Sequence, residues 1–353
     1  MDAIITDTYS VYFNKEGYKA LNQHLKKERY SKLFLLTDEN THRDCLPLFL
    51  SSLETDLEVE IIEMEAGETH KTIDTCVQIW YALSELGADR RSLMINLGGG
   101  VVTDLGGFVA CTFKRGIPFI NVPTSLLAMV DASIGGKTGV DLGNLKNQIG
   151  VIRQPEMVLV MVDFLKTLEK RQLNSGFAEM FKHGLISSGK YWSDLKDLKA
   201  NDPLESHIYR SVQIKNKIVL EDPTEKDMRK ILNFGHTLGH AIESHFLDKG
   251  ENKALLHGEA IAVGMILEGY LSHRLSSLGL HQLEDIKNTL LERFRKVDFT
   301  EEDKHAILAL LKFDKKNSHG SINFVLLKRI GDAVIDQQVP EDLFMEAFTY
   351  YEE

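Results

Sequence analysis

Residues 92–113 read SLMINLGGGVVTDLGGFVACTF, and this stretch decides the fold class of the first half of the chain. Its first part, SLMINLGGG (92–100), is an apolar run that ends in glycine, which is typical of a strand buried on both faces. The following VVTDLGGFVACTF (101–113) has the composition of an apolar helix. A strand, a glycine turn and a helix in this order predict one repeat of a covered parallel sheet.

The glycines of this turn, Gly98, Gly99 and Gly100, fit either a phosphate site or only a tight turn. Glycine lets the backbone approach a phosphate, and a helix N-terminus adds free N–H groups and a partial positive charge. The spacing departs from G-x-G-x-x-G, because Thr103 stands where the third glycine belongs. Both interpretations stay open on the turn alone.

Two other strand ends carry residues suited to a nucleotide. Asp38 ends the run KLFLLTD (32–38), where a carboxylate can accept hydrogen bonds from a ribose or cap a helix. Glu68 and Lys71 lie in AGETHKT (66–72), at another strand-to-helix junction. These residues make a nucleotide plausible without deciding it.

The first half alternates short apolar runs with helical stretches. We expect helices at 72–87 and 101–113, and strands at 32–38, 57–64, 92–100, 118–124 and 157–163. This alternation predicts an α/β domain with a Rossmann-like parallel sheet.

Beyond about residue 165 the pattern becomes helical. We expect helices at 204–220, 228–247, 256–279 and 282–295, and a late strand at 321–327 that forms a small hairpin. The sequence therefore predicts an α/β domain over 1–165 and a mainly α-helical domain over 166–353.

Composition narrows the class of protein. The chain has 353 residues, of which 43% are hydrophobic and 26% charged, as in ordinary globular proteins of two domains. A net charge of −11 argues against nucleic acid or an anionic membrane as a general partner. The three cysteines form no CxxC pair, the start lacks the pattern of a secretory signal, and no apolar run is long enough for a membrane helix. We expect a cytoplasmic protein.

A polar stripe marks the segment ILNFGHTLGHAIESHF (231–246) and the residues before it. If 228–246 is one helix, a single face carries Arg229, Asn233, His236, His240 and Glu243. Burying such a stripe without partners would cost several kcal/mol, so we expect it to line a polar cavity.

His236 and His240 have the i, i+4 spacing that can hold one metal ion. The glutamate of HExxH is absent, so the pattern of zinc proteases is excluded. A third ligand must come from elsewhere, and His257 and Glu179 are the candidates. Spacing alone leaves the choice open between the His236/His240 pair and a more distributed set.

Several cations stand in short polar or glycine-rich stretches. They are Arg115, Lys137, Lys146 beside Asn147, and Lys315–Lys316. In an acidic chain with a candidate metal site, these cations indicate a small anionic substrate, a phosphate ester or a carboxylate.

Six segments together resemble the 3-dehydroquinate synthase family over nearly the full length of the chain. They are GGGVVTDLGGFVA, RGIPFINVPTSLLAMVDASIGGKTGVD, LKNQIG, SGFAEMFKHG, RKILNFGHTLGHAIE and LLHGEAIAVGM. The resemblance rests on the sequences of all six segments and on their order along the chain, because no single segment is decisive.

The resemblance implies a metal site and a cofactor site. Glu179, His236 and His257 match the family's ligands for zinc or cobalt, and His240 matches a residue of the substrate pocket. NAD is implied at positions in the first half: Asp38, Glu68, Lys71, Gly99, Gly100, Val101, Asp104, Thr124, Ser125, Lys137, Lys146, Phe164 and Thr167.

The resemblance also implies the residues that face a small phosphorylated sugar acid. They are Asp131, Lys137, Asn147, Lys182, Lys215, Arg229, Asn233 and either Lys315 or Lys316, of which we favour Lys316. Arg115 matches a residue that reaches across the interface of a homodimer to the substrate phosphate.

The implied activity belongs to the shikimate pathway of chorismate and aromatic amino acid biosynthesis. The family converts 3-deoxy-D-arabino-heptulosonate 7-phosphate to 3-dehydroquinate and phosphate. Transient oxidation by NAD is followed by β-elimination of phosphate, re-reduction and an intramolecular aldol closure, so NAD is regenerated in each turnover.

The chain departs from the family's common wording at Asp141-Leu142-Gly143, where Asn-His-Pro is usual, and at Ser125, where a threonine is usual. Local loop and cofactor contacts depend on these positions. Alternatives are a cyclase of sedoheptulose 7-phosphate or glucose 6-phosphate, a metal-dependent polyol dehydrogenase, and a non-catalytic nucleotide-binding protein. Intact DASIGGKTG and the candidate carboxylate ligands Lys215 and Arg229 favour the heptulosonate.

Overall fold

A computed structural model describes residues 1–353 except 7, 144, 200–201, 251–252 and 312–321. Contacts between Cα atoms divide the chain into two compact units. The first unit comprises Met1–Leu173 and Leu204–Gln213, and the second comprises Asn174–Pro203 and Ile214–Glu353. No helix in the described ranges is long and apolar enough to span a membrane.

The first unit is built on a seven-stranded sheet with the order β1-β2-β9-β6-β5-β3-β4. Its strands are β1 (Ile4–Ile5), β2 (Ser10–Phe13), β3 (Leu33–Asp38), β4 (Val59–Met64), β5 (Leu93–Gly98), β6 (Phe119–Pro123) and β9 (Met157–Val160). All neighbours pair in parallel except β1 and β2. The strand predictions and the parallel sheet are therefore confirmed.

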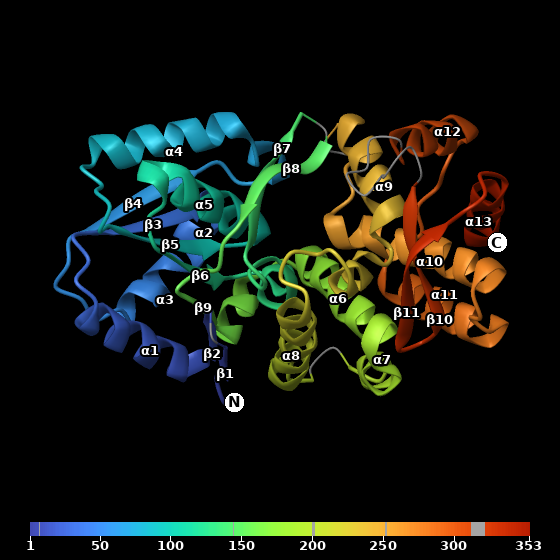
Figure 1. The fold of residues 1–353 in the computed structure, drawn as a ribbon, viewed down its shortest axis with the longest axis horizontal. Helices are drawn as coiled ribbons and strands as arrows, with labels where there is room; N and C mark the ends of the chain where they lie inside the picture. The colour runs from blue at the N-terminus through green and yellow to red at the C-terminus, as the bar shows by residue number, and fades with distance from the viewer. Residues whose placement is uncertain (7, 144, 200–201, 251–252, 312–321) are drawn as a thin grey trace. The chain divides into compact units, whose positions relative to one another are not determined.

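Helices and short helical turns connect these strands. They are α1 (Asn14–Lys27), α2 (Glu39–Asp44), α3 (Leu46–Ser51), η1 (Glu68–His70), α4 (Ile73–Glu85), α5 (Gly100–Thr112), η2 (Phe113–Arg115), η3 (Ala128–Ala132) and η4 (Val162–Thr167). Figure 1 shows α4 and α1 on opposite sides of the strands, as a parallel sheet with two covered faces requires.

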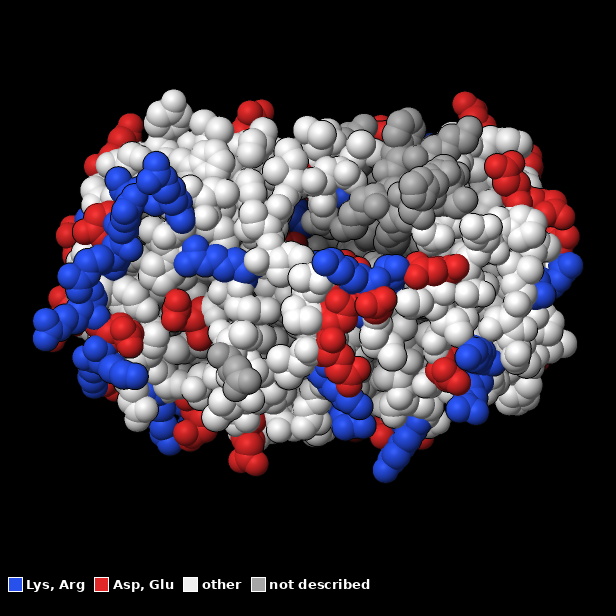
Figure 2. Space-filling model, in the orientation of Figure 1, with Lys and Arg blue, Asp and Glu red and all other residues white. Residues whose placement is uncertain are grey.

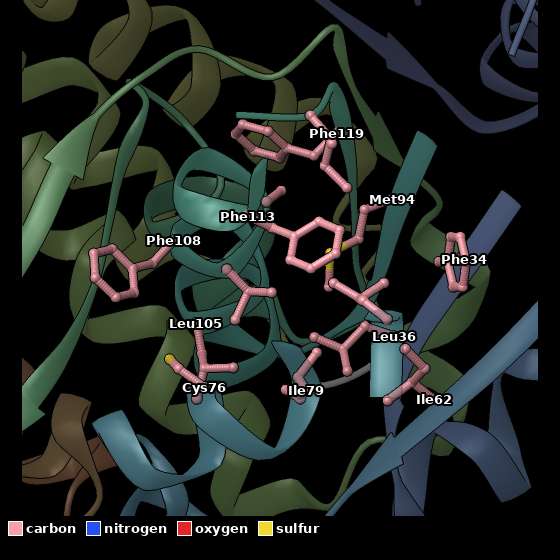
Figure 3. Close-up of a cluster of buried hydrophobic side chains, with 14 of the residues drawn as sticks. Phe34, Leu36, Ile62, Cys76, Ile79, Met94, Leu105, Phe108, Phe113 and Phe119 are labelled. Carbon is pink, nitrogen blue, oxygen red and sulfur yellow. The ribbon is translucent and has the colours of Figure 1, made fainter. Parts of the chain in front are cut away.

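The core of the first unit lies between this sheet and helices α4 and α5. It joins Phe34 of β3 and Met94 of β5 with Leu105 and Phe108 of α5, all buried. Figure 3 shows these side chains around α5 together with Phe119 of β6. This packing against the sheet positions α5, and the first residues of α5 belong to the glycine turn.

A two-stranded hairpin that the sequence did not reveal lies between β6 and β9 along the chain. Strands β7 (Lys137–Leu142) and β8 (Leu145–Ile152) pair antiparallel, and β7 packs against α5. Hydrophobic alternation is weak here because β8 is largely exposed.

The second unit is mainly helical. Its elements are α6 (Lys170–Ser187), α7 (Gly189–Lys196), α8 (Glu205–Glu221), η5 (Met228–Asn233), α9 (His236–Asp248), α10 (His257–Leu275), α11 (Leu280–Arg293), α12 (Glu301–Leu310), β10 (Asn323–Arg329), β11 (Asp332–Gln338) and α13 (Asp342–Glu352). The first residues of α6 and α8 belong to the first unit. Helix α10 is largely buried and packs against α9, α11, α13 and β10. The predicted late hairpin is confirmed by the antiparallel pair β10–β11.

Candidate active site

Three residues from three helices of the second unit converge on one point. Glu179 lies in the middle of α6, and His236 and His257 are the first residues of α9 and α10. Glu179 is 0% exposed, so its carboxylate lies in the interior of the unit. A buried carboxylate beside two imidazoles requires a compensating positive charge.

The distances between these groups suit one bound metal ion. Glu179 Oε1 lies 3.5 Å from His236 Nε2 and 3.4 Å from His257 Nε2. Ligands around one tetrahedral ion, at bond lengths of about 2.0–2.2 Å, lie about 3.3–3.6 Å from one another. One carboxylate and two histidines also leave a position open for a substrate oxygen, as catalytic zinc sites do. The residues present therefore fit a divalent ion.

The opposite nitrogen of each imidazole has a hydrogen-bond partner. His236 Nδ1 lies 3.1 Å from the backbone oxygen of Phe234, and His257 Nδ1 lies 3.0 Å from Glu243 Oε2. Metal-binding histidines use such partners to fix the tautomer and the orientation of the ring. Both Nε2 atoms are thereby directed at Glu179.

The carboxylates around His257 favour a cation at its ring. Burial alone would lower the pKa of His257, but Glu243 and Glu179 outweigh burial and raise the pKa to about 10. A divalent ion bound at Nε2 would take the place of the proton that the ring otherwise holds.

His240 belongs to the same cluster. His236, His240 and His257 each offer a nitrogen within 4.8 Å of the others. The ring centroid of His240 lies 5.1 Å from that of His236 and 5.8 Å from that of His257. The two sets of ligands left open by spacing thus lie side by side.

The predicted continuous helix over 228–247 is wrong. Residues Met228–Asn233 form the 3-10 helix η5, and α9 begins only at His236, after Gly235 in a left-handed conformation with φ 77°. A Cβ at Gly235 would lie 3.0 Å from the backbone N of Met265, so only glycine fits between α9 and α10. The stripe therefore runs along two elements and not along one face of one helix.

The polar residues before this break have their own partners. Arg229 is 1% exposed, its side chain donates to Pro223 O over 2.8 Å, and its backbone N–H donates to Asp222 over 3.2 Å. Asn233 Nδ2 donates to Glu225 Oε1 over 2.8 Å. These partners hold both side chains in the second unit.

Two lysines of the predicted substrate site are also buried in the second unit. Lys182, one turn beyond Glu179 on α6, forms an ion pair with it, and Lys215 on α8 is 6% exposed. Lys182 is therefore a buried ammonium group beside the candidate metal ligand Glu179, which suits an anionic substrate.

The glycine turn of the first unit has the geometry of a helix N-terminus. Gly99 precedes α5 as its N-cap, and Gly100 and Val101 are its first residues, so their N–H groups begin the helix. Asp104 lies one turn further along α5 and pairs with Lys71, Nζ to Oδ2, at 2.8 Å. Asp38 accepts a hydrogen bond from the N–H of Thr41 and caps α2, as one of its two interpretations predicts.

A buried network of charged side chains joins several predicted residues of this unit. Lys146 Nζ lies 2.6 Å from Glu68 Oε1 and 3.0 Å from Asp141 Oδ2. Lys71 Nζ donates to Asn147 Oδ1 over 2.7 Å. Burial alone would lower the pKa of Lys71, but Asp104, Glu68 and Asp141 outweigh it and raise the pKa.

The remaining predicted residues lie on several elements of the first unit. Thr124 and Ser125 follow β6, Asp131 lies in η3, Lys137 begins β7, Phe164 and Thr167 lie in η4, and Arg115 ends η2 with φ 72°. Lys315 and Lys316 lie outside the described residues.

Two supporting residues were absent from the predicted site. Glu243 orients His257, and the sequence placed it on the polar stripe, two helical turns after His236, without giving it a role. Glu268, a residue of α10, accepts hydrogen bonds from the N–H groups of Gly235 and Leu238. These bonds attach the start of α9 to α10. No local pattern marks Glu268, because its partners are 30 or more residues away.

Comparisons with known proteins match most of the chain. Family models described as 3-dehydroquinate synthase N-terminal and 3-dehydroquinate synthase C-terminal match residues 61–175 and 176–317. A 3-dehydroquinate synthase of Parabacteroides distasonis is 43% identical over 343 residues, which cover 96% of this chain and 96% of the relative.

Solved structures share the fold over the whole chain. A 2-deoxy-scyllo-inosose synthase complexed with carbaglucose-6-phosphate, NAD⁺ and Co²⁺ is 25% identical, with a TM-score of 0.84 and 99% of both chains covered. A 2-epi-5-epi-valiolone synthase from Streptomyces hygroscopicus subsp. jinggangensis 5008 with NAD⁺ and Zn²⁺ bound is 24% identical, with a TM-score of 0.81, and the match covers 100% of this chain and 99% of that one.

Proposed function

The chain belongs to the 3-dehydroquinate synthase family, and from that premise we propose which of its residues perform the family's reaction. The substrate is 3-deoxy-D-arabino-heptulosonate 7-phosphate, and the products are 3-dehydroquinate and phosphate. The observation that carries the assignment of the centre is the approach of one Glu179 oxygen to the Nε2 atoms of His236 and His257.

Glu179, His236 and His257 hold a divalent ion, zinc or cobalt. When bound, the ion would supply a Lewis acid, and NAD would supply a reversible hydride acceptor. Glu243 and the carbonyl of Phe234 keep the two imidazoles turned toward that ion.

The first domain, 1–165, binds NAD. Gly99, Gly100 and Val101 offer the N–H groups at the start of α5 to the pyrophosphate. Asp104, Glu68, Lys71 and Lys146 form the polar side of that site. The remaining contacts come from Asp38, Thr124, Ser125, Lys137, Phe164 and Thr167.

The helical domain, 166–353, binds the metal and contributes most of the substrate contacts. Lys182, Lys215 and Arg229 supply positive charge for the phosphate and the carboxylate, and their burial strengthens each such contact. Asn233 faces the substrate, His240 lies near its phosphate, and Asp131, Lys137, Asn147 and Lys316 complete the set. Holding a flexible intermediate for elimination and ring closure is a matter of position, which buried side chains provide.

Two further properties are part of the proposal. The chain forms a homodimer in which Arg115 of one protomer reaches the substrate phosphate bound by the other. It works in the cytoplasm, where the free thiols of Cys45, Cys76 and Cys111 stay reduced. On the face drawn in Figure 2, basic and acidic side chains are interspersed.

One assay tests the reaction and its rivals together. The purified protein is incubated with NAD⁺, Zn²⁺ and 3-deoxy-D-arabino-heptulosonate 7-phosphate, while phosphate release and NADH absorbance are followed. We expect stoichiometric phosphate and 3-dehydroquinate without net NADH. Turnover of sedoheptulose 7-phosphate or glucose 6-phosphate in place of the heptulosonate would make the protein another cyclase. Steady NADH formation from a polyol would make it a dehydrogenase.

A further inference from the structure

The hairpin β7–β8 is irregular at Asp141. Val140 pairs with Ile149, and Leu142 pairs with Leu145, with a register shift between the two pairs. Asp141 alone therefore stands opposite the three residues from Lys146 to Gln148. Irregularities of this kind redirect a side chain, and here the side chain of Asp141 is only 6% exposed.

Each oxygen of the Asp141 carboxylate contacts a different residue of β8. Oδ2 lies 3.0 Å from Lys146 Nζ, and Oδ1 accepts the backbone N–H of Asn147 over 2.6 Å. The backbone N–H of Asp141 in turn donates to Lys71 O over 2.9 Å. Asp141 thus lies at the centre of the lysine network of the first unit.

Asn147 needs such support because its backbone has φ 52°, in the left-handed region that non-glycine residues rarely occupy. The hydrogen bond from its N–H to Asp141 holds this conformation. In that conformation its side-chain oxygen accepts from Lys71 Nζ over 2.7 Å. Asp141 therefore contacts Lys146 directly, and it influences Lys71 through Asn147.

The network combines two ammonium groups with three carboxylates. Lys146 is shared by Glu68 and Asp141, and Lys71 pairs with Asp104. Buried ion pairs of this kind favour one arrangement of the side chains, because breaking a pair leaves a buried charge uncompensated. Both lysines are consequently kept in fixed positions before a ligand arrives.

We propose that Asp141 is a positioning residue that holds two lysines, Lys146 directly and Lys71 through Asn147, in the geometry that binds NAD. It acts through its contacts with Lys146 and Asn147 and not through contact with the cofactor. The proposal rests on the NAD site of the first unit described above. It gives a role to Asp141, a position at which the chain differs from the residue that is usual in its family.

The test measures the dissociation constant of NAD⁺ by titration calorimetry for the full chain and five variants. Asp141→Ala removes both acceptor oxygens, whereas Asp141→Asn keeps one of them. Lys146→Met and the double variant Asp141→Ala/Lys146→Met show whether the effect passes through Lys146. Asp89→Asn is the control, because Asp89 is a carboxylate of the same unit that accepts from Ser31 and Arg91.

We expect Asp141→Ala to raise the dissociation constant about tenfold or more, the size of a lost charge-assisted hydrogen bond. Asp141→Asn should raise it less than about threefold, because the acceptor for Asn147 remains. The loss in the double variant should be smaller than the product of the two single losses, as coupled residues require. Asp89→Asn should bind NAD⁺ as the wild type does.

The possible failures are separable. A wild-type protein that does not bind NAD⁺ would contradict the cofactor site itself, and this inference with it. A wild type that binds, with an unchanged or lower constant for Asp141→Ala, would overturn only the role of Asp141. Equal losses for the alanine and asparagine variants, or multiplicative losses in the double variant, would also overturn it. Should Asp141→Ala fail to fold, the same cycle with Asp141→Asn decides, and a lowered melting temperature with an unchanged constant would make the role structural only.

Discussion

One oxygen of Glu179 approaches two histidines that are 21 residues apart in sequence, and this approach locates the proposed metal centre. Its position in the middle of α6, 0% exposed, leaves the carboxylate few ways to move. His240 lies in the same cluster, so only a measurement of bound metal separates a ligand from a neighbour of the ligands.

His257→Ala should lose the bound metal, whereas His240→Ala should retain close to one ion per chain. The reason is that His257 Nε2 lies 3.4 Å from Glu179 Oε1 at the centre of the proposed coordination. Metal content after dialysis, measured by plasma mass spectrometry, checks this. Full retention by His257→Ala together with loss by His240→Ala would assign the site to the His236/His240 pair.

Glu243→Ala should weaken metal binding about 10–100-fold without removing a ligand, because the ring of His257 loses its oriented partner. Competition with a fluorescent zinc chelator measures the affinity. Glu259→Ala is a matched control, since Glu259 also lies at the start of α10 but accepts the backbone N–H of Leu256. Equal losses of zinc affinity in the two variants would mean that any change at the start of α10 weakens binding, and that the contact of Glu243 with His257 has no particular role.

At the scale of elements, the approach of α9 to α10 brings His236 and His257 together. Each histidine is the first residue of its helix, so a small shift of either helix would separate them. Gly264 of α10 lies against the carbonyl of Gly235, and a Cβ at this position would overlap that oxygen. Small residues therefore set the distance between the helices.

Gly235→Ala should destabilise the protein by about 3 kcal/mol or more, because left-handed strain and overpacking against Met265 add. Gly87→Ala is its control. Gly87 has the same φ of 77°, and no atom lies within 4 Å of the position that its Cβ would take, so about 1 kcal/mol is expected. Urea unfolding followed by circular dichroism gives both values. Similar losses would show that the contact with Met265 is unimportant.

Asp303 connects the start of α12 to the end of α9. Its carboxylate accepts from His245 Nε2 over 2.7 Å, pairs with Lys249, and accepts the N–H of Thr300 over 3.0 Å. Burial would raise the pKa of Asp303, but Lys249, His245 and Thr300 outweigh burial and lower the pKa below its usual 3.8.

A carboxyl group with a lowered pKa stabilises the fold above its unfolded pKa, and this stability is lost as the pH falls toward the folded pKa. The wild type should therefore be more stable than Asp303→Asn at pH 7, and the difference should shrink between about pH 5 and pH 2. Urea midpoints across this range measure it. A difference that is constant with pH would contradict the ionic role of Asp303.

At the scale of the whole molecule, each unit carries one of the two proposed ligand sites. The glycine turn and the lysine network belong to the first unit, and the cluster around Glu179 belongs to the second. A ligand that binds the folded state makes local unfolding around its binding site less frequent.

Zinc should therefore slow amide hydrogen exchange mainly in α6, α9 and α10, and NAD⁺ mainly at the start of α5 and in β7–β8. Exchange followed by mass spectrometry, with each ligand alone, checks this. The Glu179→Gln variant is the control, because it should lose the effect of zinc and keep that of NAD⁺. Protection of the first unit by zinc alone would contradict the assignment of the metal.

The sequence by itself determined the parallel sheet, the glycine turn before α5, the helical second half and the residue types of both sites. Local patterns carry these features, since apolar runs, periodicity and glycine clusters depend on neighbouring residues. The motif segments, taken together, also indicated the family that the comparisons then showed.

The tertiary structure alone decided which residues meet. The break at Gly235 follows from the close packing of α10, a helix far along the chain, and periodicity over 228–247 could not reveal it. The partners Glu243 of His257 and Asp141 of Lys146 depend likewise on a helix contact and on a strand irregularity. Distances between such groups arise only when separate segments pack, and for this reason the sequence named candidates while the fold brought Glu179 to His236 and His257.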